Sequence, residues 1–226
     1  MKRYFLLAIT TLFTTFVFAQ NVTKFLGIPV DGYKSEMIQK LKEKGYKYDA
    51  VNDCFSGEFN GRDVNIYIGT NNNKVYRIMV ADANYVSEGD IIIRYNTLCR
   101  QFAKNERYIK VSLDDYEIPA KENISYEMTV HNKRYQASYY QVTHQVDSAT
   151  IAQRYLDYLN EKYGGTDAVA NMSEDKQQEI VVELVSLALS EYEDNSVWFM
   201  ITQHYGNYGI LMYYDNLKNQ ANGEDL

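Results

Sequence analysis

The sequence predicts an α+β fold in which an antiparallel sheet carries about four helices. Three observations lead to this prediction. Apolar residues recur every three or four positions in four segments, which indicates helices with one buried face. In other segments apolar residues alternate with polar ones, which is typical of half-buried strands. Asn-rich and Gly-rich sequences lie between the alternating segments, so we expect a meander and two hairpins.

Residues 20–82 are expected to form one helix followed by three strands. Apolar residues at helical spacing predict the helix over residues 34–44, ending before Gly45. Over residues 55–81 apolar residues instead alternate with polar ones, which is typical of strands. Turns are predicted at residues 60–61 and 71–73, so this segment should be a three-stranded meander.

The middle of the chain has the same order, with a second helix and a second hairpin. The helix is predicted over residues 88–105, with Cys99 beside its apolar stripe. Alternating residues between 124 and 139 run into and out of residues 131–133, which predicts two strands joined by that turn.

Two more helices and a third hairpin follow. One helix is predicted from Ser148 to a glycine pair at residues 164–165, and another begins after Ser173. Residues 197–214 should then form a hairpin with its turn at residues 206–209.

Residues 1–19 have the order of a secretory signal peptide: two basic residues, a short apolar run and a small residue, Ala19, at the cleavage point. The run is shorter than the roughly 20 apolar residues that a spanning helix needs. We therefore expect an exported protein, periplasmic, secreted or on the cell surface, with no membrane span in the mature chain.

Residues 20–218 are predicted to be a single α+β domain, followed by a polar tail over residues 219–226. The three predicted turns recur at similar intervals, so repeated helix-hairpin units are the alternative organisation. The sub-units would then be residues 20–82, 83–146 and 147–218.

The charge of the chain limits its partners. It has 30 acidic and 23 basic side chains, a formal net charge of −7. Nucleic acid and anionic membranes are therefore disfavoured. The sequence has no motif for a metal, a nucleotide or a catalytic nucleophile, so it assigns no catalytic residue, metal ligand or cofactor.

Cys54 and Cys99 are the only cysteines. In an oxidising compartment they are candidates for a disulfide, and two buried free thiols are the alternative. A bond between them would stabilise the fold by roughly 3 to 4 kcal/mol through chain entropy.

Aromatic residues indicate a binding surface on the last hairpin. The chain has 22 tyrosines and one tryptophan, and tyrosine is enriched where proteins hold partners. Trp198, Tyr205, Tyr208 and Tyr213 are the candidate binding residues. The alternative is a central hairpin with both faces covered, in which these rings only pack.

The chain contains the stretches FLGIPVDGYKSEMIQKLKEKGYKYD and FNGRDVNIYIGTNNNKVYRIMV and ends with MYYDNLKNQANGEDL. These stretches resemble uncharacterised exported proteins of Bacteroidetes-type bacteria. A helix leading into a short meander is also similar in layout to the tandem modules of beta-lactamase inhibitor protein and of small outer-membrane assembly lipoproteins. This likeness of layout implies a binding role.

The triplet Asp147-Ser148-Ala149 resembles the Asp-Ser/Thr-apolar site at which exported proteins of that bacterial group receive O-linked glycan. The resemblance makes Ser148 a candidate glycosylation site. Capping of the helix that follows is the alternative interpretation of the same residues.

The function that these observations favour is an exported, non-enzymatic binding module that uses a tyrosine-rich sheet surface to hold an envelope protein or an extracellular ligand. A secreted hydrolase of glycans or peptides is the alternative from another class. Its carboxylates would come from the acidic groups at residues 114–117 or 191–194. A passive envelope structural protein is the third hypothesis.

Overall fold

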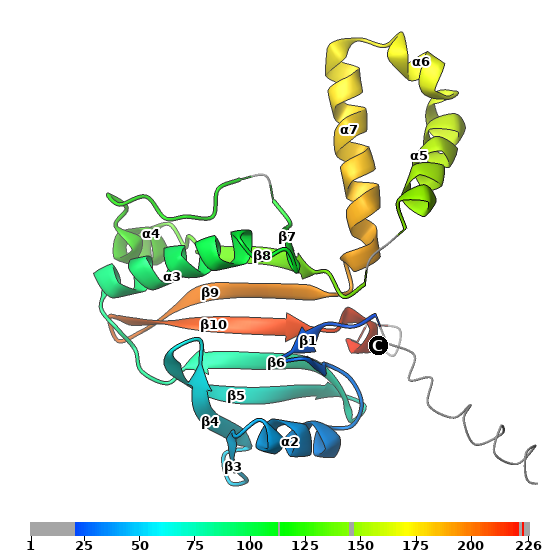
Figure 1. The fold of residues 1–226 in the computed structure, drawn as a ribbon. Coiled ribbons are helices and arrows are strands. Elements are labelled where there is room, and N and C mark those ends of the chain that lie inside the picture. Colours follow the sequence, from blue (N-terminus) through cyan, green and yellow to red (C-terminus); the bar gives the residue numbers. More distant parts are fainter. Residues whose placement is uncertain (1–20, 113, 145–146, 222, 224–226) are drawn as a thin grey trace, which may run out of the picture.

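The computed structural model describes residues 21–112, 114–144, 147–221 and 223. These residues form an eight-stranded antiparallel sheet, a separate two-stranded ribbon and six α-helices (Figure 1). The predicted α+β class is therefore confirmed. The predicted signal peptide, residues 1–19, lies outside the described residues.

The elements follow one another in this order along the chain, with η marking a 3-10 helix: β1 (Lys24–Phe25), β2 (Ile28–Pro29), α2 (Lys34–Glu43), β3 (Lys47–Asp49), β4 (Cys54–Phe59), β5 (Arg62–Asn71), β6 (Lys74–Asp82), α3 (Glu88–Ala103), β7 (Tyr108–Lys110), α4 (Ile124–Val130), β8 (Gln136–Gln141), α5 (Ser148–Tyr163), α6 (Thr166–Ala170), α7 (Glu174–Leu189), η1 (Ser190–Tyr192), β9 (Ser196–His204), β10 (Asn207–Asp215) and η2 (Leu217–Asn219).

The last hairpin of the chain occupies the centre of the main sheet. The strand order is β3-β4-β5-β6-β10-β9-β8-β7. Thus β10 pairs with β6 from the first part of the chain, and β9 pairs with β8 from the middle part. All three segments considered as sub-units contribute strands to this one sheet.

Two-residue turns join the main hairpins. The central residues have positive φ at Asn60-Gly61, at Asn72-Asn73 and at Tyr205-Gly206, as in type I′ turns, whose twist matches that of the flanking strands. The first two turns lie where the sequence predicts them. The third lies at 205–206 instead of 206–209, so Tyr208 belongs to a strand.

Residues 124–130 form the helix α4, where the sequence predicts a strand. The Asn123 side chain caps this helix by accepting a hydrogen bond from the Tyr126 amide at 2.9 Å. Ile124 and Met128 lie one turn apart and both pack on the core. The second predicted hairpin is therefore wrong, and β8 pairs with β7 and β9.

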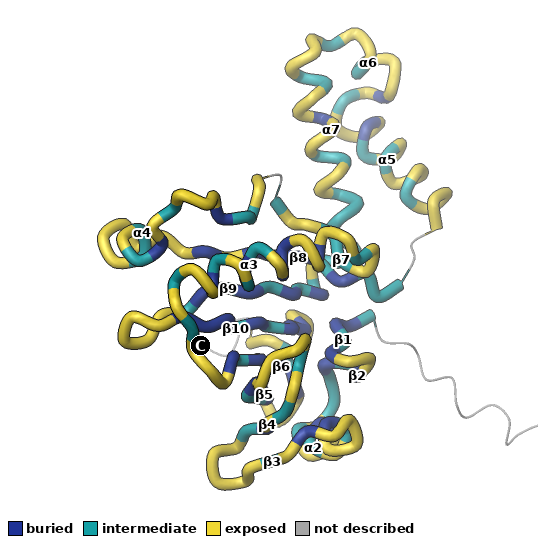
Figure 2. The backbone as a smooth tube through the Cα atoms, turned by 60° about the vertical axis from the view of Figure 1, so that its left-hand side comes forward, coloured by how far each residue is buried: buried dark blue, intermediate teal, exposed yellow. Residues whose placement is uncertain are grey.

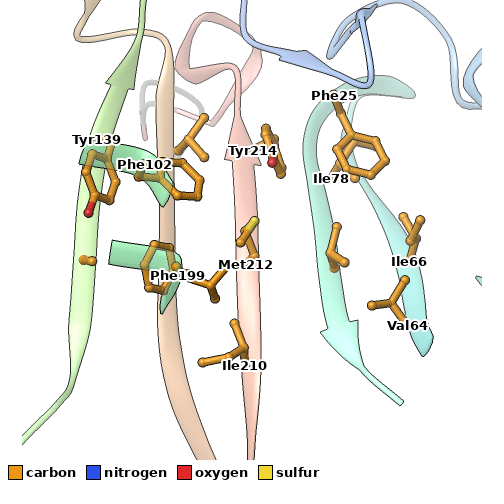
Figure 3. Close-up of a cluster of buried hydrophobic side chains, with 14 of the residues drawn as sticks. Phe25, Val64, Ile66, Ile78, Phe102, Tyr139, Phe199, Ile210, Met212 and Tyr214 are labelled. Carbon is orange, nitrogen blue, oxygen red and sulfur yellow. The ribbon is translucent and has the colours of Figure 1, made fainter. Parts of the chain in front are cut away.

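One face of the sheet carries the core. Apolar side chains from neighbouring strands lie side by side on this face, as Figure 3 shows for Val64, Ile66, Phe199, Ile210 and Met212. The helices α2 and α3 cover it and bury their apolar stripes against it. The burial of this face is the main stabilising term of the fold.

The helices α5, α6 and α7 do not pack on the sheet, which corrects the expectation that four helices cover it. They form an arm between β8 and β9 whose principal contacts are internal (Figure 1). Most of the arm is exposed or half-buried (Figure 2). Leu159 and Ile180 are its buried apolar residues.

A polar contact joins the two long helices of the arm. Glu183 on α7 accepts hydrogen bonds from the hydroxyl of Tyr163 at 2.5 Å, from Lys162 Nζ at 2.9 Å and from the hydroxyl of Tyr158 at 2.9 Å. These donors lower the pKa of Glu183 to about 2. Because the arm buries little apolar surface, these hydrogen bonds should contribute a large part of the free energy that keeps α5 and α7 packed together.

The predicted polar tail begins later than residue 219. Asn219 ends η2, and its side-chain amide donates to Asp31 Oδ1 at 2.7 Å and to the Val75 carbonyl at 2.9 Å. These two hydrogen bonds hold residue 219 against the folded domain. Residues 222 and 224–226 lie outside the described residues.

Cys54 and Cys99 are free thiols. Cys54 begins β4, whereas Cys99 on α3 contacts Tyr139 on β8. Five strand positions separate β4 from β8, a distance of roughly 24 Å at about 4.8 Å per strand. Since a disulfide needs Cα atoms within about 7 Å, the bond considered from the sequence does not form in this fold.

The substitution Glu183→Gln should loosen the arm and leave the sheet intact, because the amide loses the charge that Lys162 and the two tyrosines contact. Hydrogen exchange should become faster mainly within residues 148–189, with a smaller change at the pairing of β8 with β9 and none in β5 and β6. The folded-state pKa is depressed, so the wild-type contact is present above pH 4.5 and is lost as the pH falls toward 2. An equal increase in hydrogen exchange in β5 and β6 would contradict the conclusion that Glu183 stabilises mainly the arm.

Thiol labelling of the native protein should modify Cys54 faster than Cys99. Cys54 is half-buried, whereas Cys99 is buried and burial raises the pKa of its thiol to about 12. Denatured, unreduced protein should take two labels per chain by mass spectrometry. No label under those conditions would demonstrate a disulfide.

Candidate functional site

The face of the sheet opposite the core carries aromatic side chains in register. Cross-strand pairing places Tyr67, Met79, Tyr213, Trp198 and Ser138 in one row across five strands, from β5 to β8. None of these side chains belongs to the hydrophobic core. Each is half-buried.

Two further rows flank the first. One contains Asn65, Ala81, Leu211, Met200 and Gln136, and the other contains Gly69, Arg77 and Asp215. We call the surface of these three rows, with Tyr76, the aromatic face.

A β-bulge brings Tyr76 to this face. The register of β5 and β6 shifts so that Gly69 pairs with Arg77 and Thr70 pairs with Val75, which leaves Tyr76 as the extra residue. A Cβ atom on Gly69 would lie 3.3 Å from the Tyr76 ring. Glycine at this position therefore leaves room for the ring.

Asp215 fixes the centre of the aromatic face. It ends β10, its side chain is nearly inaccessible, and its carboxylate accepts three hydrogen bonds. Arg77 donates two of them, from Nε at 2.6 Å and from a terminal nitrogen at 2.7 Å, and Trp198 Nε1 donates the third at 2.9 Å. Charge-assisted bonds of this kind hold both side chains in one orientation.

The aromatic rings stack on this support. Trp198 and Tyr213 lie nearly parallel, with ring centroids 4.0 Å apart and an interplanar angle of 16°. The Arg77 guanidinium lies 4.9 Å from the Tyr213 ring, 5.7 Å from the Trp198 ring and 5.5 Å from the Tyr76 ring. Burial raises the pKa of Tyr213, so its hydroxyl stays neutral.

The composition of the aromatic face differs from that of an ordinary exposed surface. It contains tyrosine, tryptophan, methionine and one arginine, and none of its residues is lysine or glutamate. Protein interfaces show this enrichment and this depletion in their buried centres. Three cavities among the described residues, of about 780, 340 and 240 Å³, are lined by residues other than those of the aromatic face.

The four candidate binding residues from the sequence lie in different places. Trp198 and Tyr213 meet at the centre of the aromatic face. Tyr205 lies in the turn and is 92% exposed, away from them. Tyr208 is buried on the core face, because the turn lies earlier than predicted and the strand alternation directs its ring inward.

Sequence reasoning missed Arg77 and Asp215. A signal was present, since each is a charged residue that directly follows tyrosine in a strand rich in apolar residues. The pairing of β6 with β10 was not predicted, so nothing in the sequence joined the two residues.

The other candidates stay separate from this face. Ser148 is exposed at the start of α5, where Asp147 caps the helix. Glu117 pairs with Arg100, and Glu191 pairs with Arg154.

Neither a metal cluster nor a membrane-spanning helix occurs among the described residues. These residues contain no group of three or more His, Cys, Asp or Glu side chains placed to hold a metal ion. No helix among them is long and apolar enough to cross a membrane.

Comparison with protein-family models, with curated proteins and with solved structures found no significant match to this chain. With no similar protein to indicate a function, the proposal below rests on the geometry of the aromatic face.

The substitution Asp215→Ala should lower the free energy of unfolding by about 2 kcal/mol, because Arg77 and Trp198 Nε1 lose their acceptor and Arg77 keeps partial access to water. Urea unfolding measures this change. Asp63→Ala, at an exposed position on β5, is the control and should cost less than about 0.5 kcal/mol. Equal effects of the two variants would contradict a supporting role for Asp215.

Proposed function

We propose that this chain is an exported, non-enzymatic binding module that holds a protein partner against the aromatic face. The observation that carries the proposal is the stacked pair of Trp198 and Tyr213, fixed by Asp215 on a sheet face that α2 and α3 leave free. Export rests on the signal-peptide pattern of residues 1–19 and implies a place in the periplasm, outside the cell or on its surface.

The extent of the aromatic face favours a protein over a small ligand. The row from Tyr67 to Ser138 crosses five strands, roughly 19 Å at about 4.8 Å per strand. Small ligands bind in concave pockets, and the three cavities described above are lined by residues other than those of this face. A broad surface of rings with one arginine matches the centres of protein interfaces instead.

The rigidity of the face supports the same function. Arg77 and Trp198 are held by Asp215 before any partner arrives, so binding does not have to order these side chains. An immobilised side chain of this size otherwise costs about 0.5 to 1.5 kcal/mol on binding. The centre of the face is thus preorganised.

A charge placed on the aromatic face tests the proposal. Met200→Glu should abolish recovery of the partner when tagged protein is cross-linked in its native cell envelope and captured, because the new carboxylate would be buried unpaired in the interface. With the purified partner, the Kd should rise at least about tenfold. Wild-type protein should recover one dominant partner at a constant ratio.

Ile93→Glu is the matched control, because Ile93 is 65% exposed on α3, on the other side of the sheet. It should bind like wild type, and both variants should keep the wild-type melting temperature. Equal loss of binding in both variants would place the interface elsewhere. Turnover of a glycan or peptide substrate by wild type and Met200→Glu alike would favour the hydrolase alternative.

A further inference from the structure

A cavity of about 780 Å³ lies on the helix-covered side of the sheet, away from the aromatic face. Its walls are the β1–β2 turn, the end of β4, the C-terminal half of α3 and residues 105–108, and its floor is β10. Pockets for small molecules have volumes of about 300 to 1,000 Å³. This cavity is therefore of the right size for one.

The floor of the cavity is apolar and aromatic. Phe102 from α3 and Met212 and Tyr214 from β10 line it, and Figure 3 shows these side chains close together on the core face. Burial raises the pKa of Tyr214 well above its usual value. The floor thus presents rings, a thioether and an uncharged hydroxyl to anything bound above it.

Two basic residues, Lys24 and Arg107, line one end of the cavity. The buried Gln141 side chain accepts from the Lys24 amide at 2.6 Å and donates to the Lys24 carbonyl at 3.0 Å. The next residue, Val142, donates its amide to the Arg107 carbonyl at 2.8 Å. The backbones of Lys24 and Arg107 are therefore held at the same end of the cavity.

Among the described residues these two cations have no acidic partner, and the acidic residue that lines the cavity, Glu58, belongs to the β4 wall. Within the described residues, neither Lys24 nor Arg107 lies within 4.0 Å of a carboxylate, although the chain has more acidic than basic side chains. Both residues line the cavity together with Met212 and Tyr214 of its floor. An anionic group bound at this end would lie close to both basic residues.

We infer that this cavity binds a small amphipathic anion, with its apolar body on Phe102, Met212 and Tyr214 and its anionic head, such as a carboxylate or sulfonate, at Lys24 and Arg107. The cavity is a concave site, open on one side and of a size for a single molecule, and the sheet separates it from the aromatic face. The inference therefore goes beyond the proposed function and stands or falls independently of it.

Competition binding with the full chain tests the inference. The fluorescent anion 1-anilinonaphthalene-8-sulfonate is bound first and then displaced by decanoate, below its critical micelle concentration, or by decanol, below its solubility limit. Decanoate should displace it at concentrations at least about tenfold lower than decanol, because only decanoate has a charged head. The double substitution Lys24→Gln/Arg107→Gln should remove this preference and leave the decanol affinity unchanged.

Three control variants establish whether the two ligands bind in this cavity. Lys121→Gln/Arg134→Gln removes the same two positive charges as Lys24→Gln/Arg107→Gln, but at exposed positions outside the cavity. This variant should keep the wild-type preference for decanoate over decanol. Gln101→Trp, on the α3 wall, should narrow the cavity and weaken both ligands. Met200→Glu, on the aromatic face, should change the affinity for neither decanoate nor decanol. A failure of the cavity inference can therefore be distinguished from a failure of the proposed partner interface.

Two results would overturn the inference. One is equal displacement by decanoate and decanol in wild type and in the Lys24→Gln/Arg107→Gln variant. The other is sedimentation with phosphatidylglycerol vesicles without displacement by free decanoate, which would assign the cations to a membrane surface.

Discussion

The pairing of β10 with β6 is the constraint on which the rest of the structure depends. It joins the meander from the first part of the chain to the strands that follow α3, and without it the main sheet would be two separate sheets. The same pairing places Arg77 opposite Asp215. The continuity of the core and the organisation of the candidate site are therefore consequences of one strand contact.

The two faces of this sheet carry different side chains because successive residues of a strand point to opposite sides. In β10, Met212 and Tyr214 face α3 and the cavity, whereas Tyr213 and Asp215 belong to the aromatic face. A single strand thus contributes to the core, to the floor of a pocket and to an interaction surface. The abundance of tyrosine serves both faces, since the ring packs and its hydroxyl tolerates a polar boundary.

The sequence was sufficient for elements whose apolar period is long and whose turns are chemically distinct. The helix α3 and the meander of β4, β5 and β6 agree with prediction because the stripe of α3 is 16 residues long and Asn-Gly favours positive φ. Residues 124–130 were mistaken for a strand because a short apolar run fits either period, and the cap at Asn123 decided the outcome.

The candidate site could be predicted only in part. The aromatic content of a single hairpin, a stretch of neighbouring residues, is enough to predict Trp198 and Tyr213. Their support by Arg77 and Asp215 depends on a contact between distant segments, which no local pattern encodes. Tyr208 differs from its expected place because the turn has two residues and not four, so residues 207–209 belong to β10 and strand alternation directs the Tyr208 ring to the core.

The position of the arm has a thermodynamic consequence for the edge of the sheet. Strands β8 and β9 are neighbours, yet residues 142–195 separate them. If those residues were unstructured, closing so long a loop would cost roughly 3 kcal/mol more entropy than closing a two-residue turn. The packed arm brings its two ends together and reduces that cost. The order of α5 and α7 and the pairing of β8 with β9 are therefore coupled, although the helices do not pack on the sheet.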